Sequence, residues 1–106
     1  MVAPRRGEVW WADDPDSDKR RPYLVLTRDG AIDVLRTLTV VPATTTIRGL
    51  PSELRLSRED GMPKECALAF DNVTKLPKTW LTDRICALLP ERMHAACRAL
   101  QVALGC

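Results

Sequence analysis

Three short runs of polar side chains in this sequence have the composition needed to act on a phosphate group. The first is Lys19-Arg20-Arg21, followed directly by Pro22. A residue before proline is disfavoured in the helical region, so Arg21 is expected in extended backbone, where its planar guanidinium can donate two parallel hydrogen bonds to phosphate oxygens. The same run is also compatible with an ordinary solvated loop.

The other two runs each follow an apolar stretch. Residues 44–46 are three threonines just after Pro42; their hydroxyls can donate to phosphate without adding charge, although threonine is also a common strand residue. Asn72 can bond a base edge, but the pair Asp71-Asn72 also suits a simple turn. None of the three runs identifies a site by itself.

The cysteines and the histidine do not indicate a metal or thiol centre. The four cysteines show no C-x-x-C spacing, and the single histidine, His94, lies outside any cluster with them. Zinc sites usually contain closely spaced ligand pairs, and a nucleophilic cysteine needs an activating neighbour. We therefore expect no metal and no cofactor, and interpret the cysteines as small buried or terminal thiols (Cys66, Cys86, Cys97 and Cys106).

The composition is that of one ordinary globular domain, residues 1–106. The apolar fraction is 45%, the charged fraction 28% and the net charge only +2, so any attraction for nucleic acid must come from local clusters. The N-terminal arginines are not followed by an apolar run of signal-peptide length, and no stretch approaches a membrane span. We expect a cytoplasmic protein with reduced thiols and no membrane attachment.

The elements that would position these side chains are predicted to be short strands. Composition and alternation predict strands at residues 8–12, 22–27, 35–42, 52–56, 65–70 and 79–88, with loops or turns at 13–18, 28–30 and 57–63. Pro42 cannot donate to a ladder, so its strand is expected to end or bulge there. Leu54 and Leu56 are predicted to point inward.

The last part of the sequence predicts one amphipathic helix. Pro90 fits the first helical position, Gly105 supplies a stop, and the predicted apolar face consists of Met93, Cys97, Leu100 and Leu104. His94 then lies on the polar side with Glu91, Arg98 and Gln101, as a solvated group. Short strands followed by one helix predict a small β-barrel or sandwich closed by that helix.

Taken together and in order, these runs resemble the successive motifs of the MazF/PemK toxins. The matching stretches are residues 6–10 (RGEVW), 20–26 (RRPYLVL), 40–44 (VVPAT), 50–54 (LPSEL), 69–73 (AFDNV) and 81–85 (LTDRI). The resemblance covers essentially the whole chain. It implies a mainly β fold, a small SH3-like antiparallel β-barrel with a C-terminal α-helix as in MazF, PemK and CcdB, and a homodimer.

The resemblance also implies an activity and two partners. Such toxins are metal-independent, sequence-specific endoribonucleases that cleave single-stranded RNA and thereby inhibit translation. The 2′-hydroxyl attacks the adjacent phosphate, leaving a cyclic phosphate and a 5′-hydroxyl end. A cognate antitoxin with an acidic C-terminal tail blocks the RNA groove.

Residue by residue, the family's catalytic arginine falls on Arg21 and its catalytic threonine on Thr44. Arg21 is expected to stabilise charge that grows on the phosphoryl oxygens, and Thr44 to donate to the same group. The residues expected to bind RNA are Lys19, Arg20, Thr45, Thr46, Asn72 and Trp11.

Two departures from the family pattern bear on RNA binding. Many relatives have a Gly-Ser-Glu-Gln-like loop before the arginine, whereas residues 13–18 contain four aspartates that would repel phosphate. We hypothesise that this loop gates the site. Relatives often place an arginine where this chain has Thr74, although Lys75 lies next to it.

Two other functions remain open at this stage. The same barrel hosts toxins that poison a protein target such as gyrase, and it could also be a plain nucleic-acid-binding module. The pair Arg21 and Thr44 favours the ribonuclease. The three tryptophans either mark the dimer interface or pack internally (Trp10, Trp11 and Trp80).

Overall fold

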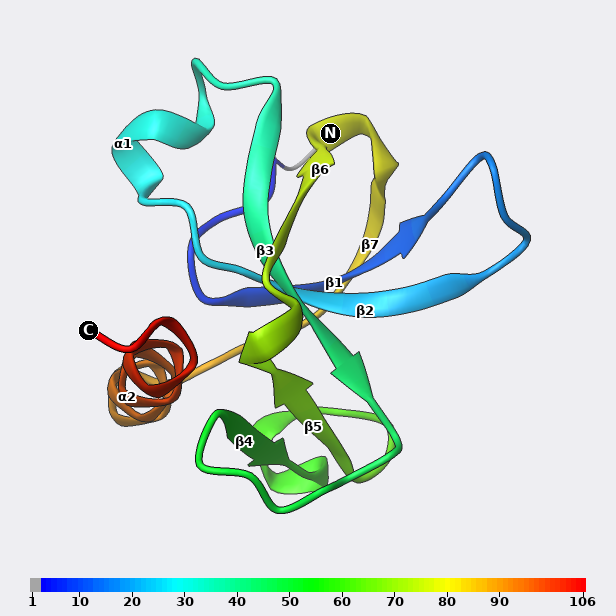
Figure 1. Cartoon of the computed structure of the whole chain (residues 1–106). Helices are drawn as coiled ribbons and strands as arrows, with labels where there is room; N and C mark the ends of the chain where they lie inside the picture. The colour runs from blue at the N-terminus through cyan, green and yellow to red at the C-terminus, as the bar shows by residue number, and fades with distance from the viewer. Residues whose placement is uncertain (1–2) are drawn as a thin grey trace.

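A computed structural model describes residues 3–106 as one curled antiparallel sheet with a helix at the end of the chain (Figure 1). The strands are β1 (Glu8–Asp13), β2 (Arg20–Val25), β3 (Thr37–Thr44), β4 (Glu53–Leu56), β5 (Cys66–Ala69), β6 (Thr74–Pro77) and β7 (Leu81–Ala87). Their order is β4-β5-β3-β2-β1-β7, with β6 paired to β3. The described sheet has open edges at β4 and β7, but it curls into a barrel-like fold, as the sequence predicted.

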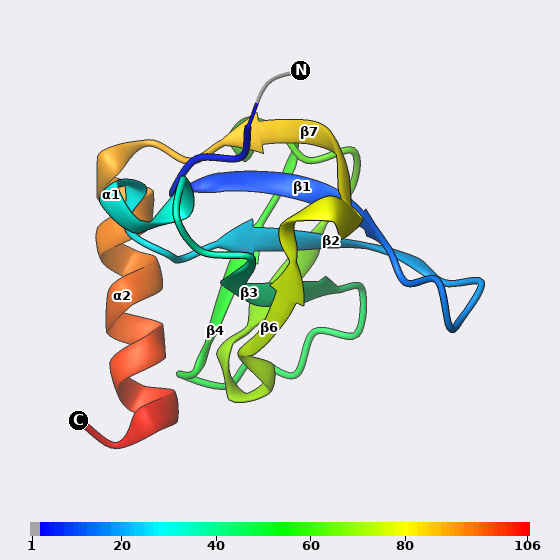
Figure 2. The same ribbon diagram turned by 90° about the horizontal axis from the view of Figure 1, so that it is seen from above.

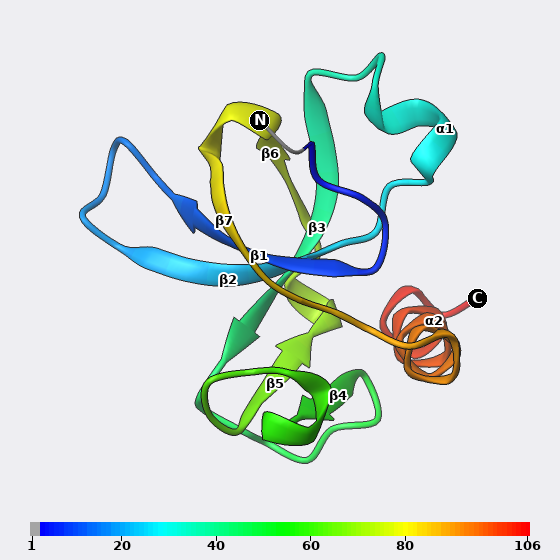
Figure 3. The ribbon, with the colours of Figure 1, turned by 180° about the vertical axis from the view of Figure 1, so that it is seen from behind.

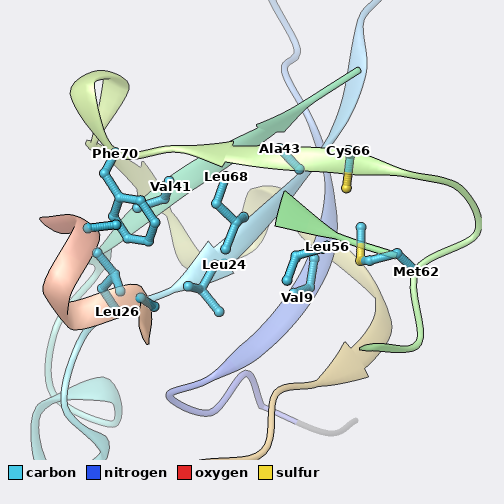
Figure 4. Close-up of a cluster of buried hydrophobic side chains, with 12 residues drawn as sticks. Val9, Leu24, Leu26, Val41, Ala43, Leu56, Met62, Cys66, Leu68 and Phe70 are labelled. Atoms are coloured by element: carbon cyan, nitrogen blue, oxygen red, sulfur yellow. The ribbon is translucent and has the colours of Figure 1, made fainter. Parts of the chain in front are cut away.

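The central strands β1, β2 and β3 are buried on both faces. Val9, Leu24 and Val41 point to a first core, which Phe70 joins, while their neighbours point to a second core (Trp10, Val25 and Val40). Figure 4 shows Phe70 at the end of the first core beside the helix, and Met62 and Cys66 at the other end. Burial on both faces explains why residues 22–27 form an almost continuous apolar run.

Two of the three tryptophans, Trp10 and Trp80, lie on the side of the second core. Trp10 is 5% exposed and donates from Nε1 to Glu8 at 3.1 Å, and Trp80 packs against the same core half-buried. Trp11 follows Trp10 in β1 and is half-buried. Trp10 thus follows the internal-packing alternative.

The helix α2 (Pro90–Leu104) begins at proline and is followed by Gly105, as predicted. Met93 and Leu100 of its predicted face pack against the first core, but the rest of that face is rotated. Ala96 and Ala99 are its buried residues, whereas Leu104 is 58% exposed and Cys97 is only half-buried. The small alanines allow the helix to lie close against the sheet in Figure 2. His94 is exposed, as expected.

Three local predictions were wrong. β3 continues through Pro42 to Thr44. Neither β5 nor β6 has a residue paired opposite Pro42, so the N–H that proline lacks disrupts no pairing with those two strands. Residues 28–30 do not form a simple turn but lead into the short helix α1 (Asp29–Ile32), which buries Ile32. Strand β6 was not predicted at all.

The remaining segments include three short 3-10 helices, η1 (Arg58–Asp60), η2 (Phe70–Asn72) and η3 (Lys78–Trp80). Leu56 in β4 is buried and Leu54 is half-buried against the first core, which confirms their inward direction. Within residues 3–106, no helix is long and apolar enough to cross a membrane.

Gly61, which ends η1, generates a prediction about stability. Its φ is +100°, and an added Cβ would lie 2.7 Å from the Cβ of Cys86. Gly61→Ala should therefore destabilise the fold by about 1–3 kcal/mol through backbone strain and steric overlap. Urea unfolding at a fixed protein concentration measures this.

Gly30→Ala is the matched control for that substitution. Gly30 has no positive φ, and nothing lies within 4 Å of its added Cβ. Alanine in α1 should leave the midpoint unchanged or raise it slightly. Equal losses in both variants would contradict the assignment of strain to Gly61.

Candidate functional site

The ends of β2 and β3 bring Arg21 and Thr44 together. The ladder between these strands ends with Tyr23 opposite Pro42; Arg21 lies two residues before Tyr23 and Thr44 two residues after Pro42, and both line the same two pockets. Because side chains alternate with a period of two, these two residues share one face. The other side of β3 pairs with β5 at this point, with Thr44 opposite Ala67.

The two side chains have complementary hydrogen-bonding capacity. The Oγ1 of Thr44 accepts the N–H of Thr46 at 3.1 Å, which leaves its own hydroxyl hydrogen available to donate. Arg21 is exposed, and among residues 3–106 its guanidinium makes no ion pair or hydrogen bond. The site therefore presents a hydroxyl donor and an uncommitted cation side by side.

Two pockets adjoin at this pair of residues. The first, of about 250 Å³, is lined by Arg21, Thr44 and Thr45 together with Trp11, Arg20 and Lys64, and we call it the Lys64 pocket. The second, of about 100 Å³, is lined by Arg21, Thr44 and Thr46 together with Arg48, Glu53 and Asn72, and we call it the Asn72 pocket. Arg21 and Thr44 line both, so a group held between them has access to either side.

Arg20 is engaged in contacts within the protein. Its guanidinium pairs with Asp83 and, at 3.4 Å, with Asp13, and it lies 4.9 Å from the centre of the Trp11 ring. Two carboxylates thus offset its charge, and one face of Trp11 is covered by a cation–π contact. Arg20 organises the wall of the Lys64 pocket more than it offers a charge to a ligand.

The structure gathers most of the predicted site residues and separates one. Arg21, Thr44, Arg20, Trp11 and Thr45 line the Lys64 pocket, while Thr46 and Asn72 line the Asn72 pocket. Lys19 lines neither; it belongs to the loop between β1 and β2, which extends away from the sheet in Figures 1 and 3. The largest hollow, of about 800 Å³, lies elsewhere, against Trp10 and Leu81, and contains none of them.

Three charged lining residues were not predicted from the sequence: Lys64, Arg48 and Glu53. Lys64 and Arg48 lie outside the motif stretches, and Glu53 lies in one of them but was interpreted only as part of a strand. The available signal was position, since Arg48 follows the threonine run by two residues and Lys64 lies two residues before β5.

The thiol next to the site is not arranged as a nucleophile. Cys66 lines the Lys64 pocket, is buried and forms no disulfide. Burial, with a further contribution from the charge of Asp60, raises its pKa above the usual value, and the same two causes raise the pKa of Cys86 to about 11. A raised pKa disfavours the reactive thiolate at neutral pH. Cys106 is exposed and Cys97 half-buried.

Thiol labelling tests this arrangement. In a Cys97→Ser background at pH 8, Cys106 should react rapidly with a disulfide reagent, whereas Cys66 and Cys86 should react only after unfolding in guanidinium. The fast phase should vanish in Cys106→Ser. Rapid labelling of Cys66 in the folded protein would contradict the assigned burial and pKa.

Comparisons with known proteins agree with this fold along nearly the whole chain. Residues 5–104 match the family model described as PemK-like, MazF-like toxin of type II toxin-antitoxin system. The chain is 47% identical over 103 residues to "Probable endoribonuclease MazF2" of Mycobacterium tuberculosis, covering 96% of this chain and 99% of that protein. It is 45% identical over 104 residues to "Probable endoribonuclease MazF5" of the same species, covering 97% and 94%.

Solved structures show the same similarity. The Mycobacterium tuberculosis toxin MazF-mt6 has a TM-score of 0.83 at 32% identity, covering 92% of this chain and 96% of that one. A mycobacterial endoribonuclease solved in complex with its cognate antitoxin has a TM-score of 0.83 at 27% identity, covering 97% and 96%. The chain therefore belongs to the PemK-like, MazF-like toxins of type II toxin–antitoxin systems.

Proposed function

We propose that this protein is an endoribonuclease toxin that cleaves single-stranded RNA at specific sequences, with Arg21 and Thr44 as its catalytic residues. The observation that carries the proposal is the pairing of an uncommitted guanidinium with a threonine hydroxyl between two adjoining pockets. The two Mycobacterium tuberculosis relatives reported above are both named probable endoribonucleases, which supports the reaction class.

The proposed reaction uses the RNA's own nucleophile. The 2′-hydroxyl oxygen attacks the adjacent phosphorus and loses its proton; the bond to the 5′-oxygen of the next nucleotide breaks, and that oxygen gains a proton. The products are a cyclic phosphate and a 5′-hydroxyl end. Arg21 and Thr44 would donate to the phosphoryl oxygens as negative charge accumulates there. A guanidinium stays protonated in proteins, so Arg21 stabilises charge rather than accepting a proton.

The flanking pockets would hold the neighbouring nucleotides. In the Asn72 pocket an amide, a hydroxyl and a guanidinium (Asn72, Thr46 and Arg48) offer donors and acceptors to a base edge. In the Lys64 pocket Thr45 and the partly covered Trp11 are available to a base or sugar. Such differently lined pockets on the two sides of one phosphate would give sequence preference.

The two other functions considered above are less well supported. A poison of a protein target would not require a phosphate-directed pair, and a plain binding module would not require a threonine hydroxyl and a guanidinium to converge between the same two pockets. Identities of 47% and 45% to proteins named endoribonucleases favour the enzyme further.

The proposal includes partners and a compartment. A mycobacterial relative was solved with its cognate antitoxin, and we propose an antitoxin with an acidic tail for this chain, because the same cations would attract it. We further propose a homodimer that works in the cytoplasm.

RNA cleavage in excess chelator tests the reaction and its two residues. Wild-type protein should cut a long single-stranded RNA at defined sites and leave 5′-hydroxyl ends. Arg21→Ala and Thr44→Ala should each lower the cleavage rate about 100-fold or more, as loss of a preorganised donor to a developing charge does. Thr44→Ser should recover most of the rate, because it keeps the hydroxyl.

Matched substitutions away from the site control for nonspecific effects. Arg98 on α2 and Thr37 at the start of β3 are both exposed and line neither pocket, so Arg98→Ala and Thr37→Ala should cleave at the wild-type rate. Folded wild-type protein that leaves every RNA intact would overturn the enzymatic proposal.

The aspartates of the β1–β2 loop provide a separate prediction. Replacing Asp14, Asp16 and Asp18 together with asparagine should tighten RNA binding and change its salt dependence if this loop opposes phosphate. Asparagine preserves the bond in which Asp14 Oδ1 accepts the N–H of Asp16 at 2.9 Å, and Asp13 is left in place because it pairs with Arg20. Unchanged affinity and salt dependence would refute a gating role.

A further inference from the structure

Two cations that no motif identified lie in the two pockets that share Arg21. Lys64 lines the larger of the two site pockets, and Arg48 lines the smaller one. Since the two pockets meet at Arg21 and Thr44, the three cations are distributed along one continuous surface. A single strand of RNA carries one phosphate per nucleotide, so a surface of this kind fits its backbone.

Lys64 is the available cation of its pocket. Arg20, the other cation there besides Arg21, is paired with Asp13 and Asp83. Lys64 forms no ion pair within residues 3–106, and the acid next to it, Glu65, points to Arg55 at 4.0 Å. Because a cation already neutralised by carboxylates releases fewer counterions from RNA, Lys64 is better suited than Arg20 to bind phosphate.

The segment that carries Arg48 is held in place by Glu53. A single carboxylate oxygen, Oε1 of Glu53, accepts the backbone N–H groups of Arg48, Gly49 and Leu50 at 3.1, 2.9 and 3.3 Å. Gly49 has a φ of +71°, which lets the chain turn around the carboxylate. The three donors offset the charge of Glu53, and the arginine side chain makes no ion pair in the described part of the chain.

The segment that carries Lys64 is held in the same manner from the helix. Asp60 Oδ1 accepts from Arg92 of α2 at 2.8 Å, and Asp60 Oδ2 accepts the N–H of Ser57 at 3.0 Å. Met62, two residues before Lys64, is 4% exposed in the first core. Arg48 therefore projects from a segment held by a carboxylate, and Lys64 follows the buried Met62 by two residues, which reduces the entropy lost when they bind a ligand.

We propose that Lys64 and Arg48 are RNA-binding residues that contact the backbone phosphates on opposite sides of the phosphate held by Arg21 and Thr44, and that Glu53 is a positioning residue for Arg48. The proposal rests on the proposed function for the identity of the ligand. It assigns a separate flanking nucleotide to each of the two cations.

Binding to a single-stranded RNA oligonucleotide that contains a mapped cleavage site tests the assignment. A 2′-deoxy nucleotide at the cut prevents cleavage, so affinity is measured without turnover by fluorescence anisotropy at several salt concentrations. Lys64→Gln and Arg48→Gln should each weaken binding, and each should reduce the slope of log K against log salt by about 0.7. Arg98→Gln, which removes the same charge from the exposed face of α2, should change neither.

Shortened oligonucleotides test the two-sided arrangement. One lacks the flanking nucleotides on the 5′ side of the cut, and the other lacks those on the 3′ side. The defect of Arg48→Gln should disappear with one of them and that of Lys64→Gln with the other. Loss of both defects with the same shortened oligonucleotide, or a wild-type slope for either variant on the full-length one, would overturn the proposal.

The positioning role of Glu53 has its own readout. Glu53→Ala should reduce the salt slope as Arg48→Gln does, and combining the two should reduce it no further. Glu53→Gln keeps an acceptor oxygen and should restore the slope. A slope that Glu53→Ala leaves unchanged would overturn this part, and circular dichroism verifies that each variant is folded.

These outcomes remain informative if the proposed function fails. A wild-type protein that cleaves no RNA would disprove the enzymatic proposal, while its binding to a mixed-sequence single-stranded RNA would still report both cations. Conversely, normal cleavage with unchanged slopes in both variants would disprove the phosphate contacts alone.

Discussion

The site depends on the register between β2 and β3. Tyr23 opposite Pro42 sets the frame in which Arg21 meets Thr44. A shift of one residue would exchange the two faces of β2, moving Leu24 out of the first core and Val25 out of the second. Since both faces are buried, such a one-residue shift preserves neither core. The hydrophobic contacts therefore fix the position of an exposed arginine and a half-buried threonine several residues away.

The change of partner along β3 completes this geometry. The first half of β3 pairs with β6 and the last two residues pair with β5, and Pro42 lies where one partner ends and before the other begins. The carbonyl and N–H groups of Thr44 are consequently supported from β5, while its side chain remains beside the pockets. A proline that looked like a strand terminator instead marks the point at which β3 exchanges neighbours.

The parts of the fold that could be predicted are those with local signals. Alternating or continuous apolar stretches between turn residues identified β1, β2, β4 and β5, and Pro90 with Gly105 bounded α2. Strand β6 offered no such signal, because only Leu76 of its four residues is buried. The inner face of α2 was misjudged because Ala96 and Ala99 contribute little hydrophobicity, although their small size is what permits close contact.

At the site, sequence predicted which side chains gather but not their charge balance. The family motifs located Arg21 and Thr44, and turn signals placed Asn72 after a strand. That Arg20 is neutralised by Asp83, 63 residues further along the chain, follows only from the pairing of β1 with β2 and β7. For the same reason Lys64 and Arg48 could not be recognised, since their value depends on which neighbouring acids are already engaged.

The acids of this nearly neutral chain have a consistent relation to the cations of the site. Asp13 and Asp83 bind the guanidinium of Arg20, whereas Glu53 accepts the backbone N–H groups of the segment that carries Arg48. Carboxylates used in the second way fix a cation without neutralising it. The net charge of +2 therefore understates the positive potential at the site. An acid that accepts backbone N–H groups counts as a full negative charge in the net charge of the chain, although it weakens the nearby cations only slightly.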